Sequence, residues 1–278
     1  MDSLVSTQWL ADTLGAPDLR IADCSWFLPG EGRDGAEDYR ATHIPGAVFL
    51  DLAEIVDTDN PAPMMLPPVE KFASRMAKLG LGDGVRIVLY DNSPHHTVAR
   101  AWMMFRSFGV PDVAILDGGL AKWRMEGRPL SADEVKPRPR HITPRARGIG
   151  VRDINAMRSN LETKAEQVVD ARSPARFAGE EPEPRPGVVP GHIPGSINIP
   201  YSRFFHQDGT WRSKDELAAV FADAGIDLAR PVTASCGSGV TASIIAFAAH
   251  LLGHEAAVYD GSWAEWGSHP ETPKETGR

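Results

Sequence analysis

The two halves of the sequence repeat one another, and this repetition limits the possible folds more than any other feature. Three pairs of similar motifs occur in the same order in both halves. The spacing within two pairs is nearly equal, 149 residues from position 43 to 192 and 143 residues from position 117 to 260. Such a repeat indicates a duplicated domain. The pairs are Leu-Arg-Ile-Ala-Asp (19–23) with Gln-Val-Val-Asp (167–170), His-Ile-Pro-Gly-Ala (43–47) with His-Ile-Pro-Gly-Ser (192–196), and Leu-Asp-Gly-Gly-Leu-Ala-Lys-Trp (116–123) with Tyr-Asp-Gly-Ser-Trp-Ala-Glu-Trp (259–266).

Each copy alternates short apolar runs with segments of helical periodicity. This alternation predicts an α/β fold in which each copy forms a parallel sheet flanked by helices on both faces. Strands are expected at 20–22, 48–49, 85–90 and 113–116, and at 167–169, 197–199, 232–235 and 256–259. Helices are expected at 6–14, 69–79 and 97–108, and at 151–160, 214–224 and 241–252.

The domain boundaries follow from the repeat. Residues 1–130 and 148–278 are predicted to form the two domains, and residues 131–147 between them carry prolines and charges without period. Such a composition is typical of a solvated linker. The 278 residues of the chain suit two domains of common size.

Charge and cysteine content exclude several classes of protein. With 37 acidic and 29 basic residues the net charge is −8, which argues against nucleic-acid binding. Neither a secretory signal nor an apolar run of membrane-spanning length is visible, so no membrane association is expected. The two cysteines, Cys24 and Cys236, exclude a disulfide framework and a cysteine-rich zinc site. A reducing cytoplasm fits these features best.

The loop Cys236-Gly-Ser-Gly-Val-Thr-Ala242 is the main candidate for a functional site. It joins an expected strand to an expected helix, and such a turn directs several backbone N–H groups to one point at the positive end of the helix dipole. A cysteine at the head of that turn gains a stabilised thiolate and can act as a nucleophile. Two other interpretations stay open: a small buried hydrophobe, and a loop that binds phosphate without covalent chemistry.

Alignment of the two copies places Asp91 where the second copy has Cys236. The first copy continues without the two glycines, so its domain is expected to be structural and to enclose the substrate. His95 and His96 follow in this loop, but adjacent histidines point in different directions, and we expect no metal site there. Cys24, next to Asp23, is expected to be a packed thiol.

Arg176 and Arg185 lie in a segment rich in proline and glycine that follows a predicted strand, where loops of α/β domains line the binding crevice. Guanidinium groups there can bind a carboxylate through two hydrogen bonds. The alternative is that they form ion pairs with glutamates of the same segment, which are Glu180, Glu181 and Glu183. The residues alone favour neither interpretation.

Three motifs together resemble the tandem-domain rhodanese superfamily. They are the loop 236–242, Arg176-Phe with Pro182-Glu-Pro-Arg-Pro-Gly187, and Gly191-His-Ile-Pro-Gly195. The resemblance covers nearly the whole chain, including the replacement of the first-copy cysteine by aspartate. Within the superfamily the chain is most similar to the members that use 3-mercaptopyruvate, because thiosulfate-using relatives carry basic residues after the cysteine, where this chain has Gly237 and Ser238.

The resemblance implies a two-step sulfur transfer that needs no cofactor and no metal. Cys236 takes the sulfur of 3-mercaptopyruvate as a persulfide, pyruvate leaves, and a thiol acceptor, such as a thioredoxin-like protein, or cyanide removes the outer sulfur. Arg176 and Arg185 would hold the carboxylate and ketone of the substrate. Loop amides would stabilise the thiolate and the persulfide, namely those of Gly237, Gly239, Val240 and Thr241. The alternatives are a thiosulfate sulfurtransferase and a non-enzymatic sulfur-carrier or protein-binding module.

One part of the family pattern is missing. Relatives pair the serine that corresponds to Ser238 with an aspartate and a histidine of the first domain as a proton relay. Asp51 matches the aspartate, but Met64 stands where the histidine is expected, so this relay cannot operate as in the relatives. Either Ser238 hydrogen-bonds the substrate or the intermediate, or another group, with His95 and His96 as candidates, handles the proton. A phosphatase of the common type is disfavoured too, because Ala242 stands where its loop needs an arginine.

Overall fold

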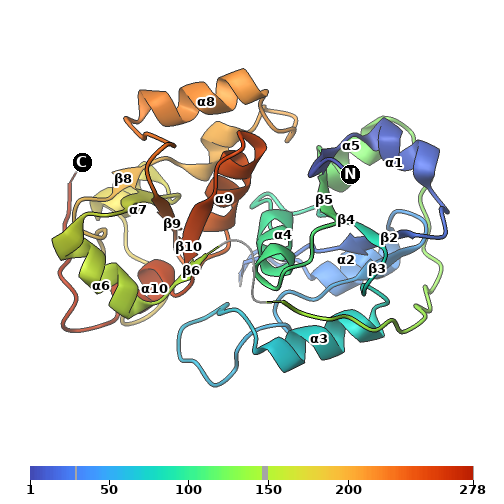
Figure 1. Cartoon of the computed structure of the whole chain (residues 1–278), viewed down its shortest axis with the longest axis horizontal. Coiled ribbons are helices and arrows are strands. Elements are labelled where there is room, and N and C mark those ends of the chain that lie inside the picture. The colour runs from blue at the N-terminus through green and yellow to red at the C-terminus, as the bar shows by residue number, and fades with distance from the viewer. Residues whose placement is uncertain (29, 146–149, 278) are drawn as a thin grey trace. The chain divides into compact units, whose positions relative to one another are not determined.

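The computed structural model describes residues 1–28, 30–145 and 150–277 (Figure 1). The chain divides into two compact units. Unit 1 comprises Met1–Asp57, Leu66–Gly148 and His206–Trp211, and unit 2 comprises Thr58–Met65, Ile149–Phe205 and Arg212–Arg278. A short segment after the third strand of each repeat is thus grouped with the other repeat. The predicted boundary at 147 and 148 lies outside the described residues.

Unit 1 is built on a five-stranded parallel sheet in the order β1-β5-β4-β2-β3. The strands are β1 (Leu4–Val5), β2 (Leu19–Asp23), β3 (Ala47–Phe49), β4 (Arg86–Tyr90) and β5 (Val113–Leu116). The helices are α1 (Thr7–Thr13), α2 (Gly35–Ala41), α3 (Val69–Lys78), α4 (Val98–Ser107) and α5 (Gly119–Met125).

Unit 2 repeats this arrangement, with a parallel sheet in the order β6-β10-β9-β7-β8. The strands are β6 (Val151–Arg152), β7 (Gln167–Asp170), β8 (Ile197–Asn198), β9 (Val232–Ser235) and β10 (Ala256–Tyr259). The helices are α6 (Ile154–Thr163), α7 (Pro174–Ala178), the 3₁₀ helix η1 (Tyr201–Phe204), α8 (Lys214–Asp223), α9 (Ala242–Leu251) and α10 (Ser262–Trp266). Within this unit α9 lies on one side of the sheet and α6 and α10 on the other (Figure 1). The predicted fold class is confirmed.

The central strands of both sheets end in the same register. Asp23 of β2 lies beside Tyr90 of β4, and Asp170 of β7 lies beside Ser235 of β9. Because parallel strands end at one edge of the sheet, the residue that follows β9 and the loop that follows β7 meet there. This register brings the Cys236 loop and the arginine-bearing segment of unit 2 to one edge.

Two edge strands were not predicted. Each of β1 and β6 has only two residues, too few to show a period. The helix that the sequence predicts at 151–160 begins instead at Ile154, because the carboxylate of Asp153 accepts a hydrogen bond from Ala156 N at 2.8 Å and caps the helix there. Residues 151 and 152 pair with β10 as β6.

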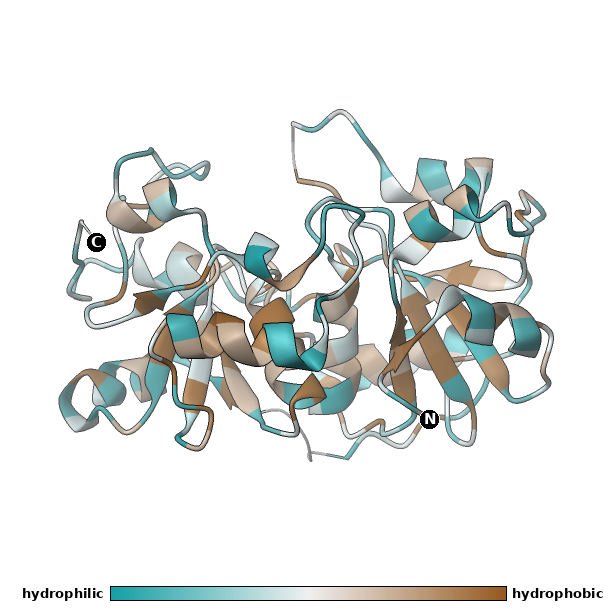
Figure 2. Cartoon of the chain, turned by 90° about the horizontal axis from the view of Figure 1, so that it is seen from above, coloured by the Kyte–Doolittle hydropathy of each residue, from teal (hydrophilic) through white to brown (hydrophobic). Residues whose placement is uncertain are grey.

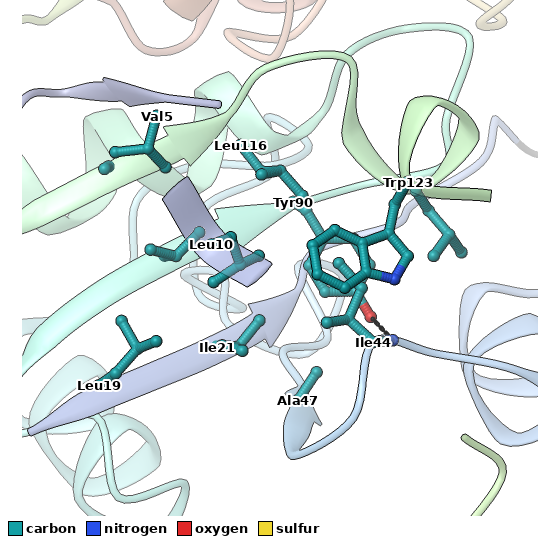
Figure 3. Close-up of a cluster of buried hydrophobic side chains, with 12 residues drawn as sticks. Val5, Leu10, Leu19, Ile21, Ile44, Ala47, Tyr90, Leu116 and Trp123 are labelled. Atoms are coloured by element: carbon teal, nitrogen blue, oxygen red, sulfur yellow. Dashed lines mark hydrogen bonds between the residues drawn. The ribbon is translucent and has the colours of Figure 1, made fainter. Parts of the chain in front are cut away.

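Apolar strand residues form the cores, and Figure 2 shows them in brown beside helices whose exposed turns are teal. In unit 1 the indole of Trp123 and the ring of Tyr90 pack among aliphatic side chains (Figure 3). The buried hydroxyl of Tyr90 accepts a hydrogen bond from Ile44 N at 3.2 Å, so its polar atom is satisfied. In unit 2 the equivalent cluster is Met157, Val168, Ile193, Tyr259, Trp263 and Trp266.

The histidines of the repeated His-Ile-Pro-Gly motif have structural roles. The His43 ring stacks on Tyr39 and its Nδ1 lies 2.8 Å from the carbonyl oxygen of Tyr39. In the same way the His192 ring stacks on Phe177, with Nδ1 at 2.8 Å from the Phe177 carbonyl oxygen. Each histidine also forms an isolated bridge to a segment near the end of its repeat. The motif therefore ties the sheet edge to the chain that leaves the domain.

The described part of the predicted linker, residues 131–145, runs extended along unit 1. Arg140 N donates to Ala77 O at 2.9 Å, and Arg145 N donates to Phe108 O at 2.8 Å. Residues 146 and 147 lie outside the described residues. In the described part of the chain no helix is long and apolar enough to cross a membrane.

Candidate active site

Cys236 directly follows the buried strand β9, and five residues separate it from α9. Its side chain is 1% exposed. The loop that it heads ends at Thr241, the residue before the ten-residue helix α9. The sulfur thus lies at a sheet edge near the positive end of a helix dipole, where an anion is stabilised.

Ser262 fixes the shape of this loop. Its Oγ accepts hydrogen bonds from Cys236 N at 3.1 Å and Gly239 N at 3.0 Å, and it donates to Tyr259 O at 2.8 Å. Ser262 is fully buried and has a positive φ of 48°. Trp263 N also donates to Cys236 O at 2.9 Å. The start of α10 is therefore joined to the cysteine loop by both side chain and backbone.

These hydrogen bonds show which loop amides are free to donate to an anion. The Gly239 amide, which the family resemblance assigns to stabilising the thiolate and the persulfide, instead donates to Ser262. Within the described residues the N–H groups of Gly237, Ser238, Val240 and Thr241 have no hydrogen-bond acceptor. These four donors can stabilise a thiolate or persulfide. Sequence reasoning did not single out Ser262, although it lies inside the repeated motif at 259–266.

Arg176 reaches over the cysteine loop from α7. A Cβ atom at Gly237 would lie 3.2 Å from Arg176 Nη2, so glycine leaves room for the guanidinium there. The same Nη2 donates to Glu183 Oε2 at 2.5 Å. The ion-pair alternative therefore holds for Arg176, with Glu183 as the partner. Its buried Nε–H has no acceptor among the described residues and remains available to a ligand.

Arg185 differs from Arg176, because it forms no ion pair with any described residue. Its side chain is partly buried, and burial lowers the pKa of its guanidinium. The sulfur of Cys236 and, to a smaller extent, the carboxylate of Glu183 raise this pKa, whereas Arg176 lowers it further. Arg185 thus interacts electrostatically with the sulfur, and it carries a positive charge that has no ion-pair partner among the described residues.

A buried charge network supports the arginine segment. The guanidinium of Arg172, 1% exposed, donates to Asp170 Oδ2 at 2.7 Å and to Glu183 Oε1 at 2.8 Å. It also lies over the ring of Trp263 at 4.7 Å. Burial lowers the pKa of Arg172, but Asp170 and Glu183 outweigh burial and leave that pKa above its ordinary value. Arg172 stays charged and holds Glu183 in place.

At the matching place in unit 1 the structure has a carboxyl group. Asp91 Oδ2 accepts a hydrogen bond from Val98 N, the first residue of α4, at 3.0 Å. It also lies 3.2 Å from Thr97 Oγ1. Burial raises the pKa of Asp91 to about 7, and Asp23 adds to this shift. In unit 1 the side chain of Asp91 therefore occupies the N-terminal end of α4, and no thiol of the described residues lies there.

The other predicted residues of unit 1 do not gather into a metal site. His95 Nε2 pairs with Glu31 Oε1 at 2.8 Å, while burial lowers the pKa of His96 to about 4. Among the described residues no group of three histidine, cysteine or acidic side chains is arranged to hold a metal ion. Cys24 is fully buried, and burial raises the pKa of its thiol.

The two residues of the family relay that this chain retains belong to different units. Asp51 of unit 1 is exposed, and its Oδ1 accepts hydrogen bonds from Ala53 N at 2.9 Å and Glu54 N at 3.3 Å. Ser238 belongs to unit 2 and is 6% exposed. Met64, at the place where relatives have histidine, has a positive φ of 61° and is grouped with unit 2.

Comparison with known proteins adds the family context. The model of the Rhodanese-like domain matches residues 6–126 and 153–269. The chain is 42% identical to human 3-mercaptopyruvate sulfurtransferase over 271 residues, which cover 95% of this chain and 91% of that protein. It is 39% identical to rat thiosulfate sulfurtransferase over 286 residues, which cover 99% of this chain and 96% of that protein.

Solved structures agree with these matches. A crystal structure described as the 3-mercaptopyruvate sulfotransferase SseA from Escherichia coli superposes with a TM-score of 0.86 at 35% identity, and covers 95% of this chain and 99% of that one. The Tum1 protein from Saccharomyces cerevisiae superposes with a TM-score of 0.86 at 28% identity, and covers 98% of both chains.

Proposed function

Since this chain belongs to the rhodanese family as a tandem-domain sulfurtransferase, of the kind that uses mercaptopyruvate or thiosulfate, we propose that its sulfur donor is 3-mercaptopyruvate. The observation that carries this proposal is the charge of the site. The loop side chains after Cys236 are uncharged, and Arg185 is the cation beside the sulfur that lacks a carboxylate partner among the described residues. One unpaired guanidinium suits the single carboxylate of a 2-oxo acid.

In the first step the Cys236 thiolate attacks the sulfur of the donor. A sulfur–sulfur bond forms, the carbon–sulfur bond breaks, and its electron pair passes to the enolate of pyruvate. The enolate takes up the proton that the donor thiol loses, so pyruvate leaves and a persulfide anion remains on Cys236. The four unpaired loop amides stabilise this anion, because they lie at the start of α9 and require no reorganisation.

In the second step an acceptor thiolate attacks the outer sulfur of the persulfide. The new sulfur–sulfur bond forms on the acceptor, and the Cys236 thiolate is the leaving group. We propose a thiol as the acceptor, with thioredoxin-like proteins as candidates. Arg185 would hold the donor carboxylate, Arg176 would donate its unpaired Nε–H to the ketone oxygen, and Ser238 would bond the substrate next to the nucleophile.

The decisive experiment compares the two donors. Pyruvate release from 3-mercaptopyruvate and thiocyanate formation from thiosulfate with cyanide are measured, together with the mass of the protein after each donor. We expect a larger kcat/KM for 3-mercaptopyruvate and one added sulfur on Cys236. Thiosulfate is the second candidate donor, because rat thiosulfate sulfurtransferase is 39% identical to this chain, against 42% for human 3-mercaptopyruvate sulfurtransferase. A larger kcat/KM for thiosulfate overturns the proposal.

The arginines are tested in the same assay. Arg185→Ala and Arg176→Ala remove charged hydrogen bonds worth about 1.5–3 kcal/mol each, so KM for 3-mercaptopyruvate is expected to rise about tenfold or more. Arg203→Ala is the matched control, because Arg203 is an exposed arginine of the same unit that pairs with Asp223. An unchanged KM in the Arg185 variant contradicts its role as the carboxylate anchor.

A further inference from the structure

Glu183 occupies an unusual position for a residue of a proline-rich surface segment. Its side chain is 4% exposed, although Glu181 and Pro182 before it are exposed. One carboxylate oxygen accepts from Arg172 Nη1 at 2.8 Å, and the other accepts from Arg176 Nη2 at 2.5 Å. Glu183 thus bridges a fully buried arginine and an arginine that faces the cysteine loop.

The charges of this network balance. Arg172 and Arg176 carry two positive charges, while Asp170 and Glu183 carry two negative charges, and all four side chains are joined by ion pairs. Arg185 is added to this neutral set without a carboxylate partner among the described residues. The cationic segment of the site therefore presents one net positive charge, although it contains three arginines.

We propose that Glu183 sets the charge of the donor that the site accepts, because it neutralises Arg176 and leaves Arg185 as the single uncompensated cation. A monoanionic 2-oxo acid is matched by this charge. Thiosulfate, a dianion, brings a second negative charge that no cation compensates and that the Cys236 thiolate repels. This inference rests on the proposed function and names the residue that produces its donor preference.

The test is Glu183→Gln, which removes one negative charge at nearly constant shape. We expect kcat/KM for thiosulfate to rise relative to kcat/KM for 3-mercaptopyruvate by about tenfold or more, because Arg176 regains its charge toward the donor. A merely structural role for Glu183 would lower both values together. An unchanged ratio overturns the inference.

Two further variants sharpen this test. Glu181→Gln makes the same charge change in the same segment, but Glu181 is exposed and has no ion pair among the described residues, so its donor ratio should stay that of the wild type. Arg172→Gln combined with Glu183→Gln restores the charge balance, and its ratio should return toward the wild-type value. A double variant that keeps the ratio of the single variant contradicts the charge argument.

The wild-type protein provides a test that does not depend on the folding of a variant. Methanesulfonate and sulfate have similar shapes but carry one and two negative charges. We expect sulfate to compete with 3-mercaptopyruvate no more tightly than methanesulfonate does. Sulfate inhibition about tenfold tighter or more would show a site with two uncompensated cations and would overturn the inference.

The outcomes separate this inference from the proposed function. The proposed function fails if the wild-type protein prefers thiosulfate. The inference fails if Glu183→Gln leaves the donor ratio unchanged, whichever donor the wild type prefers.

Discussion

The two strand-to-helix loops of the molecule occupy equivalent places but use their helix starts differently. In unit 1, Leu120 N donates to Asp91 O at 2.9 Å, and in unit 2, Trp263 N donates to Cys236 O at the same distance. Asp91, however, turns its own carboxylate onto the first amide of α4. Cys236 has no such group, so the donors of its loop stay available.

The lengths of the two loops and the residues that support them explain this difference. The first loop has one more residue before the threonine that precedes its helix, and it lacks the two glycines of the second loop. Gly119, with φ of 53°, stands where unit 2 has Ser262 with φ of 48°. On the proposed function, the duplicated fold would bind sulfur only where the amides of the loop have no acceptor within the loop and a serine hydroxyl holds the turn.

The largest expected effect comes from Cys236→Ser. A serine hydroxyl is not ionised near neutral pH and cannot carry a persulfide, so we expect no detectable sulfur transfer. Pyruvate release and the mass of the donor-treated protein measure this loss. A thermal unfolding midpoint close to the wild-type value serves as the control for folding. Turnover near the wild-type rate would refute the nucleophile assignment.

Ser262→Gly should have the next largest effect. Glycine tolerates the positive φ of this position, as Gly119 does in unit 1, so the backbone should be retained. Without the hydroxyl, the amides of Cys236 and Gly239 lose their acceptor, and we expect kcat/KM to fall by about tenfold to a hundredfold. The pH dependence of Cys236 alkylation should change as well.

Ser268→Gly is the matched control for this variant, because among the described residues the Ser268 hydroxyl donates only to the backbone carbonyl oxygens of Ala264 and Glu265 in α10. It should leave kcat/KM unchanged. If Ser262→Gly retained the wild-type kcat/KM, the cysteine loop would keep its shape without the serine, and the contrast with unit 1 would rest on the cysteine alone.

Most of the sheet could be predicted from the sequence, because buried parallel strands appear as short apolar runs. All eight predicted strands are present in the structure, within one or two residues at their ends. The edge strands β1 and β6 could not be predicted, since two residues have no period and these strands, unlike β8, do not follow the repeated His-Ile-Pro-Gly motif. The start of α6 was misplaced for a similar reason, as the cap at Asp153 outweighs the apolar pattern that begins at residue 151.

The site was predictable only in part. The local pattern around Cys236 indicates its loop, and the repeat indicates that Asp91 replaces it. The two supporting contacts depend on the folded chain: Ser262 is 26 residues from Cys236, and Glu183 lies between two arginines whose pairing has no sequence signature. One sequence signal for Ser262 was available: it stands at the position of the repeated motif where the first copy has Gly119.

Asp91→Asn tests the unit 1 side of the comparison through stability. The carboxyl of Asp91 has a pKa raised by burial to about 7, above its ordinary value, so its contribution to stability is complete below the ordinary pKa and is lost as the pH rises through about 7. Asparagine does not titrate. Between about pH 4 and about pH 8, the free energy of unfolding of the wild-type protein should therefore fall by more than that of the variant, and the extra loss should be at most about 4 kcal/mol.

Urea unfolding at several pH values measures this difference, and sulfur transfer by the variant should stay unchanged. Asp23, whose pKa burial also raises, is present in both proteins and contributes in the same direction. Stability curves that stay parallel across this pH range would show that the Asp91 carboxyl is charged in the folded protein.

The smallest effect is expected from Asp51→Asn. Asp51 follows Leu50, whose N–H donates to Asp23 O, and the equivalent position in unit 2 is Pro200, which follows Ile199. The carboxylate of Asp51 accepts from two backbone amides of its own turn, and an asparagine oxygen can do the same.

With Met64 in place of the relay histidine, we expect kcat for 3-mercaptopyruvate to stay within about twofold of the wild-type value. The unfolding midpoint should fall only slightly, because the turn keeps its acceptor. A decrease of kcat by about tenfold or more at unchanged stability would show that Asp51 takes part in proton transfer. Unit 1 would then supply a catalytic group to a reaction that the two loops otherwise assign to unit 2 alone.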